Sequence, residues 1–503
     1  MSLTLKASEL YHEEYAEFIN RWELITDVIA GKEDIDEKGD TYLPIPSGRS
    51  DTEYQAYQKR AVLYNATART MDGLLGALFR KDVKVEVPEP LEYILDNTDG
   101  EDNGVNQFSK KVATNVISKG RQGILVDFPQ ASGITTLREE RNANMKARIQ
   151  TYTPESIVNW KVVKDGGLLK LTHVLLKEEE HRVKGHAFKF EKFTRYRVLE
   201  LDPEGFYFIR ILEERKDEKT NTSFYTEVET IVPRLPNGEL LDKIPFFFVG
   251  SIDNGAKVNK APLYDLAQLN ISHYRNSADY EEALFMIGQP TSWISGLNKD
   301  FIDENRGNIK IGSRITWLLP PESQVGLLES KADKNILQKA MELKESEMLG
   351  LGARIMQDNS SSGSESAESV SLRRSGESSQ LSCIADNINK AMTEALKLCA
   401  RWMGLDDSKV KYSINKEFFS KRLSHQELQA LVAAWQGSAI SRAVLFDNLR
   451  KGEIIDPTFE DDEIISDIEE EEPNLLIGGD LDNADVGSNN QASSGLGEIQ
   501  EEG

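Results

Sequence analysis

The chain has 503 residues, of which 39% are hydrophobic and 29% charged. This composition supplies enough apolar material for a large core and excludes a collagen-like or wholly disordered chain. The length predicts about three domains. The strongest apolar run, residues 244–250, is far shorter than the ~20 residues needed to cross a bilayer.

Two further features indicate the compartment. The first 18 residues lack a basic region followed by an apolar stretch, so we expect no secretory signal. The two cysteines, Cys383 and Cys399, are too few to stabilise a chain of this length through disulfide bonds, which fits a reducing compartment.

The net charge of −24 is concentrated at one end of the chain. Residues 452–503 contain 17 acidic and no basic residues, whereas the preceding 451 residues contain 67 acidic and 60 basic ones. The body is therefore close to balanced, and its composition excludes a strongly basic nucleic-acid-binding protein. Any contact with DNA would have to be weak or local.

Apolar residues recur at helical spacing near the N-terminus and predict a first helix with one buried face: Tyr11, Tyr15, Phe18, Trp22 and Ile25. Gly31 is expected to end this helix. A Pro- and Gly-rich break over 41–51 separates it from a second helical stretch that ends at Phe79. A short strand over 83–87 and a further helix precede a buried strand within 120–129.

Between about 150 and 250 the pattern changes to strands rich in β-branched and aromatic residues, which predict an antiparallel sheet: 152–160, 171–176, 193–201 and 206–212. The segment Asp202–Gly205 predicts a turn, because Pro203 presets φ and Gly205 tolerates positive φ.

Three long helices are predicted next, over 264–288, 331–356 and 367–404. The first would be about 37 Å long at ~1.5 Å per residue. Residues 289–329 between the first two are expected to be a small module with strands within 291–296, 308–319 and 324–329.

The third helix has the most regular apolar seam in the chain: Ile384, Ile388, Ala391, Ala395, Leu398 and Trp402. The polar linker 357–368 before it is expected to be flexible. Two shorter helices follow, the first behind a capping box of Ser424 and Glu427 and the second over 441–450. Beyond Asp456 the composition predicts a solvated, disordered tail.

No arrangement of residues predicts a catalytic, metal or cofactor site. The chain has no phosphate-binding loop, and His12-Glu13-Glu14 lacks the second His of a metalloprotease motif. We expect His273 to be packed or interfacial, and both cysteines to be small buried hydrophobes. The acids Asp461 and Asp462 belong to a solvated charge run. The sequence therefore predicts a protein without enzymatic activity.

The order of these elements resembles that of the bacteriophage portal protein, the ring through which double-stranded DNA enters and leaves a capsid. Several stretches are similar to one portal subfamily: 57–82, 120–129, 152–160, 265–296 and 365–377. The resemblance covers about 5–450 and is most specific in 265–296 and 365–377.

The resemblance implies an α+β, predominantly helical portal fold. Its parts would be a wing over 1–260, stem helix one over 261–288, a clip over 289–329, stem helix two over 330–356, a tunnel loop over 357–368, a long tunnel helix over 369–405, a helical crown over 406–455 and the acidic tail over 456–503. Such a chain would form a ring of twelve subunits at one capsid vertex, and would occupy the host cytoplasm during assembly.

The resemblance also implies partners. They would be further copies of the chain, the large terminase, major capsid and scaffold proteins, head-tail connector or adaptor proteins, and DNA passing non-specifically; no membrane anchor is implied. The loop residues expected to approach the DNA are Gln357, Asp358, Asn359, Ser360, Ser361, Ser362, Ser364 and Glu365. Asp279, Glu281 and Glu282 would face the tunnel, unless they form an ordinary solvated face.

Two further groups have an expected role. Arg373 and Arg374 would contact phosphate or pair with acids of a neighbouring subunit; the flanking Glu365, Glu368 and Glu377 favour the pairing. The clip mixes aromatic and basic residues, which favours contacts with neighbouring clips and docking partners: Trp293, Lys299, Phe301, Arg306, Lys310 and Trp317.

Two other classes of function compete with the conduit. A nuclease or packaging ATPase would need a carboxylate metal cluster or a nucleotide cradle, and the sequence indicates neither. An acidic helical adaptor, or another virion structural protein without a channel, would act through its tail.

Overall fold

The computed structural model describes residues 4–6, 9–128, 146–183, 188–216, 223–235, 237–289, 291–305, 319–328, 334–352, 367–416, 418, 425–451, 454–455, 459 and 461–471. The chain divides into two compact units, residues 1–418 and 419–503. Helices take up 48% of the structure and strands 24%. The mixed helix-and-strand class expected from the sequence is confirmed.

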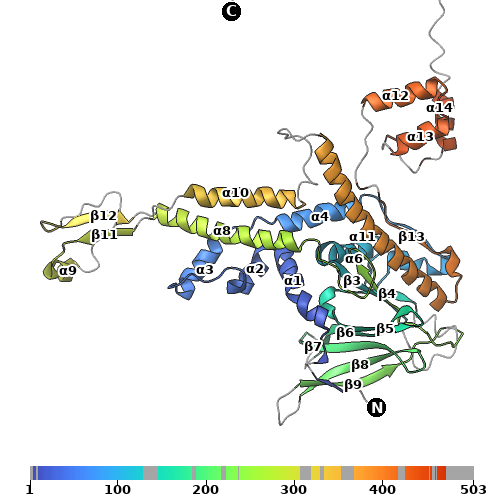
Figure 1. Ribbon diagram of the computed structural model, residues 1–503, viewed down its shortest axis with the longest axis horizontal. Coiled ribbons are helices and arrows are strands. Elements are labelled where there is room, and N and C mark those ends of the chain that lie inside the picture. Colours follow the sequence, from blue (N-terminus) through green and yellow to red (C-terminus); the bar gives the residue numbers. More distant parts are fainter. Residues whose placement is uncertain are drawn as a thin grey trace, which may run out of the picture. The chain divides into compact units, whose positions relative to one another are not determined.

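The larger unit contains a six-stranded antiparallel sheet (Figure 1). In spatial order its strands are β1 (Thr4–Lys6), β9 (Ser223–Ile231), β8 (Tyr207–Lys216), β7 (Phe190–Leu201), β6 (Leu168–Val183) and β5 (Ile157–Asp165). The predicted turn between β7 and β8 is confirmed, because Gly205 has φ +91° and its amide donates to the carbonyl of Asp202 at 2.9 Å.

A three-stranded antiparallel sheet lies against the first one and consists of β10 (Phe246–Gly250), β3 (Arg121–Asp127) and β4 (Arg148–Tyr152). Arg121 joins the two sheets. Its guanidinium lies 4.3 Å from the ring centroid of Trp160 on β5 and 4.0 Å from that of Phe248 on β10, and it donates to the carbonyl of Ala256 at 2.9 Å. Burial lowers the pKa of Arg121 to about 9.

Helices cover these sheets and form the rest of the core. They are α1 (Glu13–Ala30), α2 (Lys32–Lys38), α3 (Asp51–Arg60), α4 (Ala66–Leu78), α5 (Tyr93–Asp96) and α6 (Val105–Lys119). The structure confirms the first helix and its end at Gly31, and it buries Tyr15, Trp22 and Ile25. Tyr11 precedes the helix and is 49% exposed, so its expected place on the buried face is wrong.

The second predicted helical stretch is two helices, α3 and α4, because Asn65 caps α4 by accepting from the amide of Ala68. The metalloprotease-like His12 caps α1 instead: its Nδ1 accepts from the amide of Glu14, and its ring stacks on Trp160 at 4.0 Å.

Three long helices follow the sheets. They are α8 (Tyr264–Gly288), α10 (Lys334–Gly350) and α11 (Ala367–Trp402). All three agree with the sequence in position, although α10 is shorter than the predicted 331–356. The strands β11 (Thr291–Ser295) and β12 (Gln324–Leu328) confirm two of the three strands expected between α8 and α10. The third, within 308–319, lies outside the described residues, and the helix α9 (Lys299–Asn305) was not expected.

Two buried tyrosines tie α8 to the helices beneath it, and a third, Tyr42, ties the segment after α2 to α1. Tyr274 on α8 donates to Asp36 at 2.7 Å, Tyr57 on α3 donates to Asp279 on α8 at 2.6 Å, and Tyr42 donates to Asp27 at 2.6 Å. The surrounding cluster is apolar and includes Ile25, Val28, Ile35, Leu43, Ala267, Ile271 and Ala278.

The apolar seam of α11 is confirmed. Ile384, Ile388, Ala391, Ala395 and Trp402 are buried, and Leu398 is half-buried. After α11 the short strand β13 (Lys411–Ser413) pairs with β2 (Lys84–Glu86). Cys399 is fully buried, as expected, whereas Cys383 is only half-buried and its thiol contacts the carbonyl of Ile252 at 3.2 Å. The expectation that both cysteines are buried is therefore wrong for Cys383. Its side chain lies on the part of α11 that contacts the loop at Ile252 and not in the buried seam.

The smaller unit contains α12 (His425–Gln436), α13 (Arg442–Lys451) and α14 (Asp461–Glu471). The first two confirm the predicted helices; the capping residue Ser424 lies outside the described residues. The expectation of a disordered tail from 456 onward is wrong for α14. Three acids lie in its first turn, where the positive end of the helix dipole stabilises negative charge, and Asp461 pairs with Arg450 at 2.5 Å.

The turn from α6 into β3 generates a stability prediction. Gly120 has φ +77°, and a Cβ there would collide with the carbonyl of Lys260. We expect Gly120→Ala to lower the free energy of unfolding by more than about 2 kcal/mol, because left-handed strain of roughly 1–2 kcal/mol adds to the collision. Urea denaturation followed by tryptophan fluorescence measures this.

Gly48→Ala is the matched control, since Gly48 has φ +83° and open space around it. It should cost only the strain, about 1–2 kcal/mol. Equal losses in the two variants would show that the close approach to Lys260 contributes nothing.

Candidate functional site

The most distinctive feature of the larger unit is a pair of antiparallel helices with a strand-containing end. We call α8, α10 and the described residues between them the arm. Figure 1 shows α8 and α10 side by side, with β11 and β12 beyond the C-terminal end of α8. Two contacts fix the register of the pair: His273 Nε2 lies 3.1 Å from Glu345 Oε1, and Lys344 Nζ donates to the carbonyl of Ser272 at 3.0 Å.

His273 is only 2% exposed, which confirms that it is an interfacial histidine. Burial lowers its pKa, the Lys344 ammonium lowers it further, and the hydrogen bond to Glu345 opposes both effects. The ring of Tyr64 lies 5.8 Å away on the other side. The neutral imidazole is therefore the form that this packing favours.

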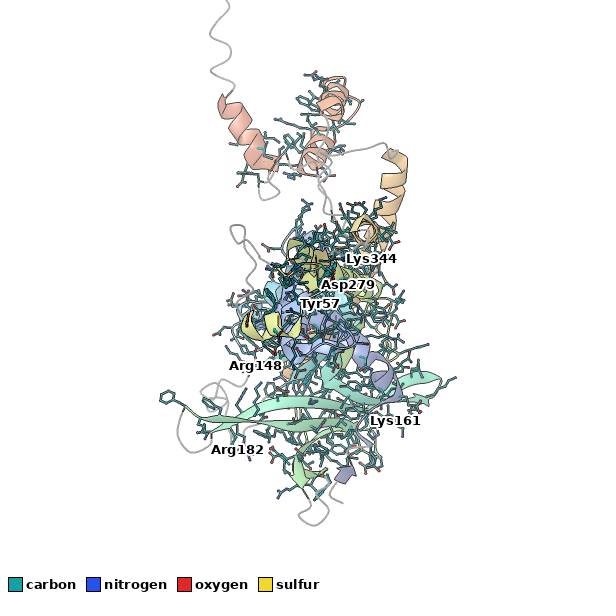
Figure 2. All side chains as sticks on the ribbon, turned by 90° about the vertical axis from the view of Figure 1, so that its left-hand side faces the viewer. Tyr57, Arg148, Lys161, Arg182, Asp279 and Lys344 are labelled. Carbon is teal, nitrogen blue, oxygen red and sulfur yellow. The ribbon has the colours of Figure 1, made fainter. Side chains whose placement is uncertain are left out.

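A cluster of charged groups connects α3 to the middle of α8. Glu282 pairs with Arg49 at 3.2 Å and with Arg60, and Arg60 also lies 4.2 Å from the ring centroid of Phe285. Figure 2 shows Tyr57 and Asp279 adjacent to each other in this region. Burial and the hydrogen bond to Asp279 raise the pKa of Tyr57.

This cluster corrects a prediction for α8. Asp279 and Glu282 were expected to face a tunnel, but both bind side chains of the preceding helix α3 or the loop before it. Side chains four and three residues apart lie on one face of a helix, and here that face carries Asp279 and Glu282 toward α3. The role of Glu281 stays a prediction.

The outer part of the arm exposes apolar side chains. Four consecutive residues of α8, Leu284–Ile287, are 36–54% exposed, and Ile336 near the outer end of α10 is 65% exposed. The inner part of α8 is different, because Ala267, Ile271, Tyr274 and Ala278 are buried in the core. Along its length α8 therefore changes from a helix that is buried in the core to one that exposes apolar side chains to solvent.

The strand module at the end of the arm contains three of the predicted interface residues. Trp293 on β11 lies opposite Gly326 on β12 and is 43% exposed. A side chain at Gly326 would occupy the place of the indole ring, so this glycine makes room for Trp293. Lys299 begins α9 and is exposed, and Phe301 in the same helix is half-buried. Arg306, Lys310 and Trp317 lie outside the described residues.

The remaining predicted residues lie at or before the start of α11. The loop residues Gln357 to Glu365 are outside the described part of the chain. Arg373 and Arg374 fall within α11, but only its backbone is described there. The structure therefore groups Trp293, Lys299 and Phe301 in one module and leaves the grouping of the others a prediction.

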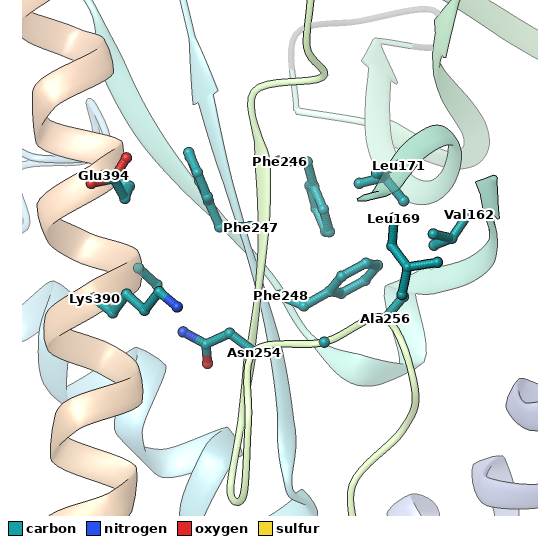
Figure 3. Close-up of a pocket in the computed structure, with 12 residues that line it drawn as sticks. Val162, Leu169, Leu171, Phe246, Phe247, Phe248, Asn254, Ala256, Lys390 and Glu394 are labelled. Atoms are coloured by element: carbon teal, nitrogen blue, oxygen red, sulfur yellow. The ribbon is translucent and has the colours of Figure 1, made fainter. Parts of the chain in front are cut away.

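A hollow lies between α11 and the two sheets of the larger unit (Figure 3). It has a volume of about 340 Å³ and three consecutive phenylalanines on its wall, Phe246, Phe247 and Phe248. Lys390 and Glu394 of α11 lie on one side, and Val162, Leu169 and Leu171 of the β5–β6 hairpin on the other. The sequence singled out 244–250 only as an apolar run, because a hollow needs several distant segments to meet.

The sequence also missed the arginines and the tyrosine that bind α8 from α3. Arg49, Tyr57 and Arg60 are ordinary surface-type residues of a short helix and its approach. No local sequence pattern connects these two arginines and this tyrosine with the acids on one face of the later helix α8, so the sequence alone could not predict the pairing.

Within the described part of the chain, no group of three or more His, Cys, Asp or Glu side chains is placed to hold a metal ion. None of the described helices combines the length and apolar character needed to span a membrane.

Comparison with known proteins gives one family model, described as a domain of unknown function (DUF4055), which matches residues 262–403. No curated protein matches the chain. The matched segment covers the arm and α11.

Two solved structures are similar to the chain at low levels. One is a chain of the virion of a native gene transfer agent particle, with a TM-score of 0.40 and 12% identity over 79% of this chain and 94% of that one. The other is a chain of the neck of an empty gene transfer agent particle, with a TM-score of 0.38 and 10% identity over 78% and 92%. Likeness at this level does not assign a function to this chain.

The cluster around Glu282 generates a prediction. Glu282→Gln removes the charge that pairs with Arg49 and Arg60, and we expect it to weaken the docking of α3 by about 1–2 kcal/mol. Amides of α3 should then exchange hydrogen roughly tenfold faster, since 1.4 kcal/mol corresponds to a factor of ten. Glu281→Gln is the adjacent control and should leave exchange unchanged; equal effects would remove Glu282 from its proposed role.

The buried His273 generates a pH prediction. Its folded pKa lies below its unfolded value of about 6.5, so the unfolded chain binds the proton first as the pH falls. Stability should therefore decrease from about pH 6.5 downward until the folded pKa is passed, with a slope of at most about 1.4 kcal/mol per pH unit. His273→Gln should lack this component in urea denaturation at pH 7.5 and pH 5; an identical pH dependence in both proteins would contradict it.

Proposed function

We propose that this chain is a structural subunit of a phage-like particle, and more specifically a portal-type subunit. In this role copies form a ring at one capsid vertex, and double-stranded DNA passes through the ring during packaging and ejection. The chain itself carries out no catalysis; it supplies the channel and the platform on which other proteins dock.

The observation that carries the proposal is the arm. Two antiparallel helices leave a compact core, carry a small strand module at their outer end and return to a third long helix. This order agrees with the portal resemblance of the sequence in 265–296. The inner half of α8 is packed in the core, and the contacts of Asp279 and Glu282 with α3 and Arg49 continue this anchoring outward, so the arm is held in a defined direction.

The exposed apolar residues of the arm support assembly. Leu284, Met286 and Ile336 are more than a third exposed, and large apolar side chains left in solvent favour a protein contact. Side-by-side packing of identical arms around an axis would cover them, because a contact between two different faces repeats around a closed ring.

The polar linker before α11 suits a channel that binds DNA only weakly. Each phosphate neutralised by a base strengthens binding through counterion release. Residues 357–368 contain Ser, Asn, Gly and acids and no Lys or Arg. A loop of this composition can contact DNA through hydrogen bonds while leaving it free to move.

The strand module is the proposed docking end of the arm. Trp293 presents a 43% exposed aromatic ring, and the base Lys299 lies in the same module; exposed aromatic residues are enriched at protein interfaces. We assign it to neighbouring copies, to the large terminase during packaging and to connector proteins afterwards. Capsid and scaffold proteins would contact other parts of the ring.

The alternative is an acidic helical adaptor without a channel. The separate unit over 419–503 and its acidic helix α14 favour it. Deleting 456–503 separates the two functions, because rings should still form without the tail if the chain is a portal subunit.

Ring formation is the direct test. We expect negative-stain images and light scattering of the full chain to show a ring with a central hole. Leu284→Gln combined with Met286→Gln should reduce the ring fraction at least about tenfold, because it places polar groups in the contact. Ile45→Gln, on a residue that is 50% exposed outside the arm, is the control. A chain that stays monomeric at all concentrations would contradict the proposal.

A second test concerns the channel. Shortening 359–364 should leave rings intact and impair DNA packaging or retention, because the deletion removes the loop proposed to meet the DNA. Normal packaging by rings that carry this deletion would remove the channel role of the loop.

A further inference from the structure

One end of the six-stranded sheet is a two-stranded ribbon that projects beyond the other strands. β6 pairs with β5 only up to Leu176, and β7 pairs with β8 only from Arg195. Among the described strands, residues 177–183 and 190–194 therefore pair only with each other. Figure 2 shows this ribbon leaving the sheet on the side of Arg182. Its end is a projecting point and not part of a flat face.

The ribbon ends in apolar side chains. Val183 and Phe190 are directly opposite each other and are 56% and 60% exposed, and Phe188 is 90% exposed. We call Val183, Phe188 and Phe190 the ribbon tip. Phe188 is the most exposed large apolar side chain in the described part of the molecule. Aromatic rings held in water at a projecting point favour burial in another surface.

Basic side chains lie next to and directly behind the ribbon tip. Lys189 stands between the two phenylalanines of the tip in the sequence and is exposed. Arg182 lies one residue pair behind the tip, opposite Glu191, and Lys192 lies two pairs behind it. The side chains of Arg182 and Lys192 are 66% and 72% exposed. Long basic side chains of this kind can extend their charged ends along a surface that covers the tip.

The other acidic side chains of the ribbon lie farther from the tip. Glu178–Glu180 are three to five residues behind Val183 along β6, which is ~10–17 Å. Each of these acids has a basic partner at 2.6–3.9 Å: Arg197, Lys192 and Arg195. Toward its end the ribbon therefore changes from paired charges to exposed bases and then to apolar side chains.

This order of side chains matches the surface of an anionic bilayer. In a bilayer the acyl chains lie deepest, the lipid phosphates lie above them, and interfacial proteins bury apolar groups about 5–10 Å into the boundary. Basic side chains beside those groups then reach the phosphates. The backbone of DNA presents its phosphates first, so a DNA contact requires bases ahead of apolar groups. On the ribbon the apolar groups are foremost, which favours a lipid surface.

The charge near the tip is positive although the whole chain is acidic. The described residues 181–183 and 188–192 contain three Lys or Arg and one Glu. The acidic excess of the chain belongs to residues 452–503, and the rest of the composition is close to balanced. Exposed charges separated by more than about 8–10 Å are largely screened at physiological salt. The local positive charge of the tip therefore decides its attraction to an anionic surface.

We propose that the ribbon tip is a contact site for an anionic lipid surface. The three tip side chains enter the boundary between headgroups and acyl chains, and Lys189, Arg182 and Lys192 bind lipid phosphates. A site with so few apolar groups gives reversible binding. This inference goes beyond the proposed function and does not depend on ring formation.

Vesicle flotation tests the contact directly. The full chain is mixed with vesicles of phosphatidylcholine that contain about 30% phosphatidylglycerol, or with phosphatidylcholine vesicles alone. We expect it to float with the anionic vesicles only. Phe188→Ser combined with Phe190→Ser should lower the bound fraction at least about tenfold, because it removes the apolar groups that enter the bilayer. Leu168→Ser combined with Leu169→Ser is the matched control and should bind normally, since both leucines are 77% exposed at the opposite end of β6.

A fluorescent label reports whether the tip itself enters the bilayer. In a Cys383→Ser background, Phe188→Cys is labelled with the environment-sensitive dye NBD; Cys399 is fully buried and does not compete for the dye. We expect the emission to shift to shorter wavelength when anionic vesicles are added, because the dye leaves water. The same dye on Leu168→Cys should show no shift. Equal shifts at both positions would overturn the assignment of the contact to the tip.

The remaining outcomes separate the lipid contact from other partners and from the ring. Lys189→Glu should lower flotation with anionic vesicles, and equal binding to both kinds of vesicle would contradict the charge pairing. Binding of duplex DNA that Lys189→Glu abolishes, without any flotation, would assign the bases to nucleic acid and overturn the inference. Rings in negative-stain images without flotation would overturn it and leave the portal proposal intact. Flotation of a chain that forms no rings would support the inference and contradict the portal proposal.

Discussion

The structure of the larger unit depends on the anchoring of one long helix. The inner half of α8 places Ala267, Ile271, Tyr274 and Ala278 in a core formed with α1, α2 and α3. Tyrosine-to-aspartate hydrogen bonds at 2.6–2.7 Å add direction to this apolar contact. Because a helix is stiff, an anchor at one end also fixes the line along which the outer half and its strand module extend.

The arm carries different surfaces at its two ends, and this difference has a physical cause. Near the core, the buried His273 meets the half-exposed Glu345 where α8 and α10 pack together. Farther out, α8 contacts α10 and, at Glu282 and Phe285, α3 or the loop before it, and these neighbours leave part of its apolar surface uncovered. The side chains that remain exposed there are those that an assembly of copies would cover.

The charge of the molecule, like its fold, differs between the larger unit and the end of the chain. The large unit has a nearly balanced composition and places its acids in pairs with arginines, as Glu282 does with Arg49 and Arg60. The acidic excess belongs to the end of the chain, where α14 begins with three acids. In the proposed role as a DNA conduit, a body without a basic excess would leave DNA free to move, because each phosphate that a base neutralises strengthens binding.

The sequence by itself determined most of the longer helices, their order and most of their buried faces, but not the short α9 or the acidic α14. Periodic seams such as Ile384 to Trp402 and the turn at Gly205 are local patterns, and local patterns fix local structure. Only the tertiary structure decided which acids of α8 bind α3, that Cys383 is half-exposed, and that Leu169 and Phe246 meet at one hollow. These features join residues tens to hundreds of positions apart, and no period or motif in a single sequence records which distant segments will pack together.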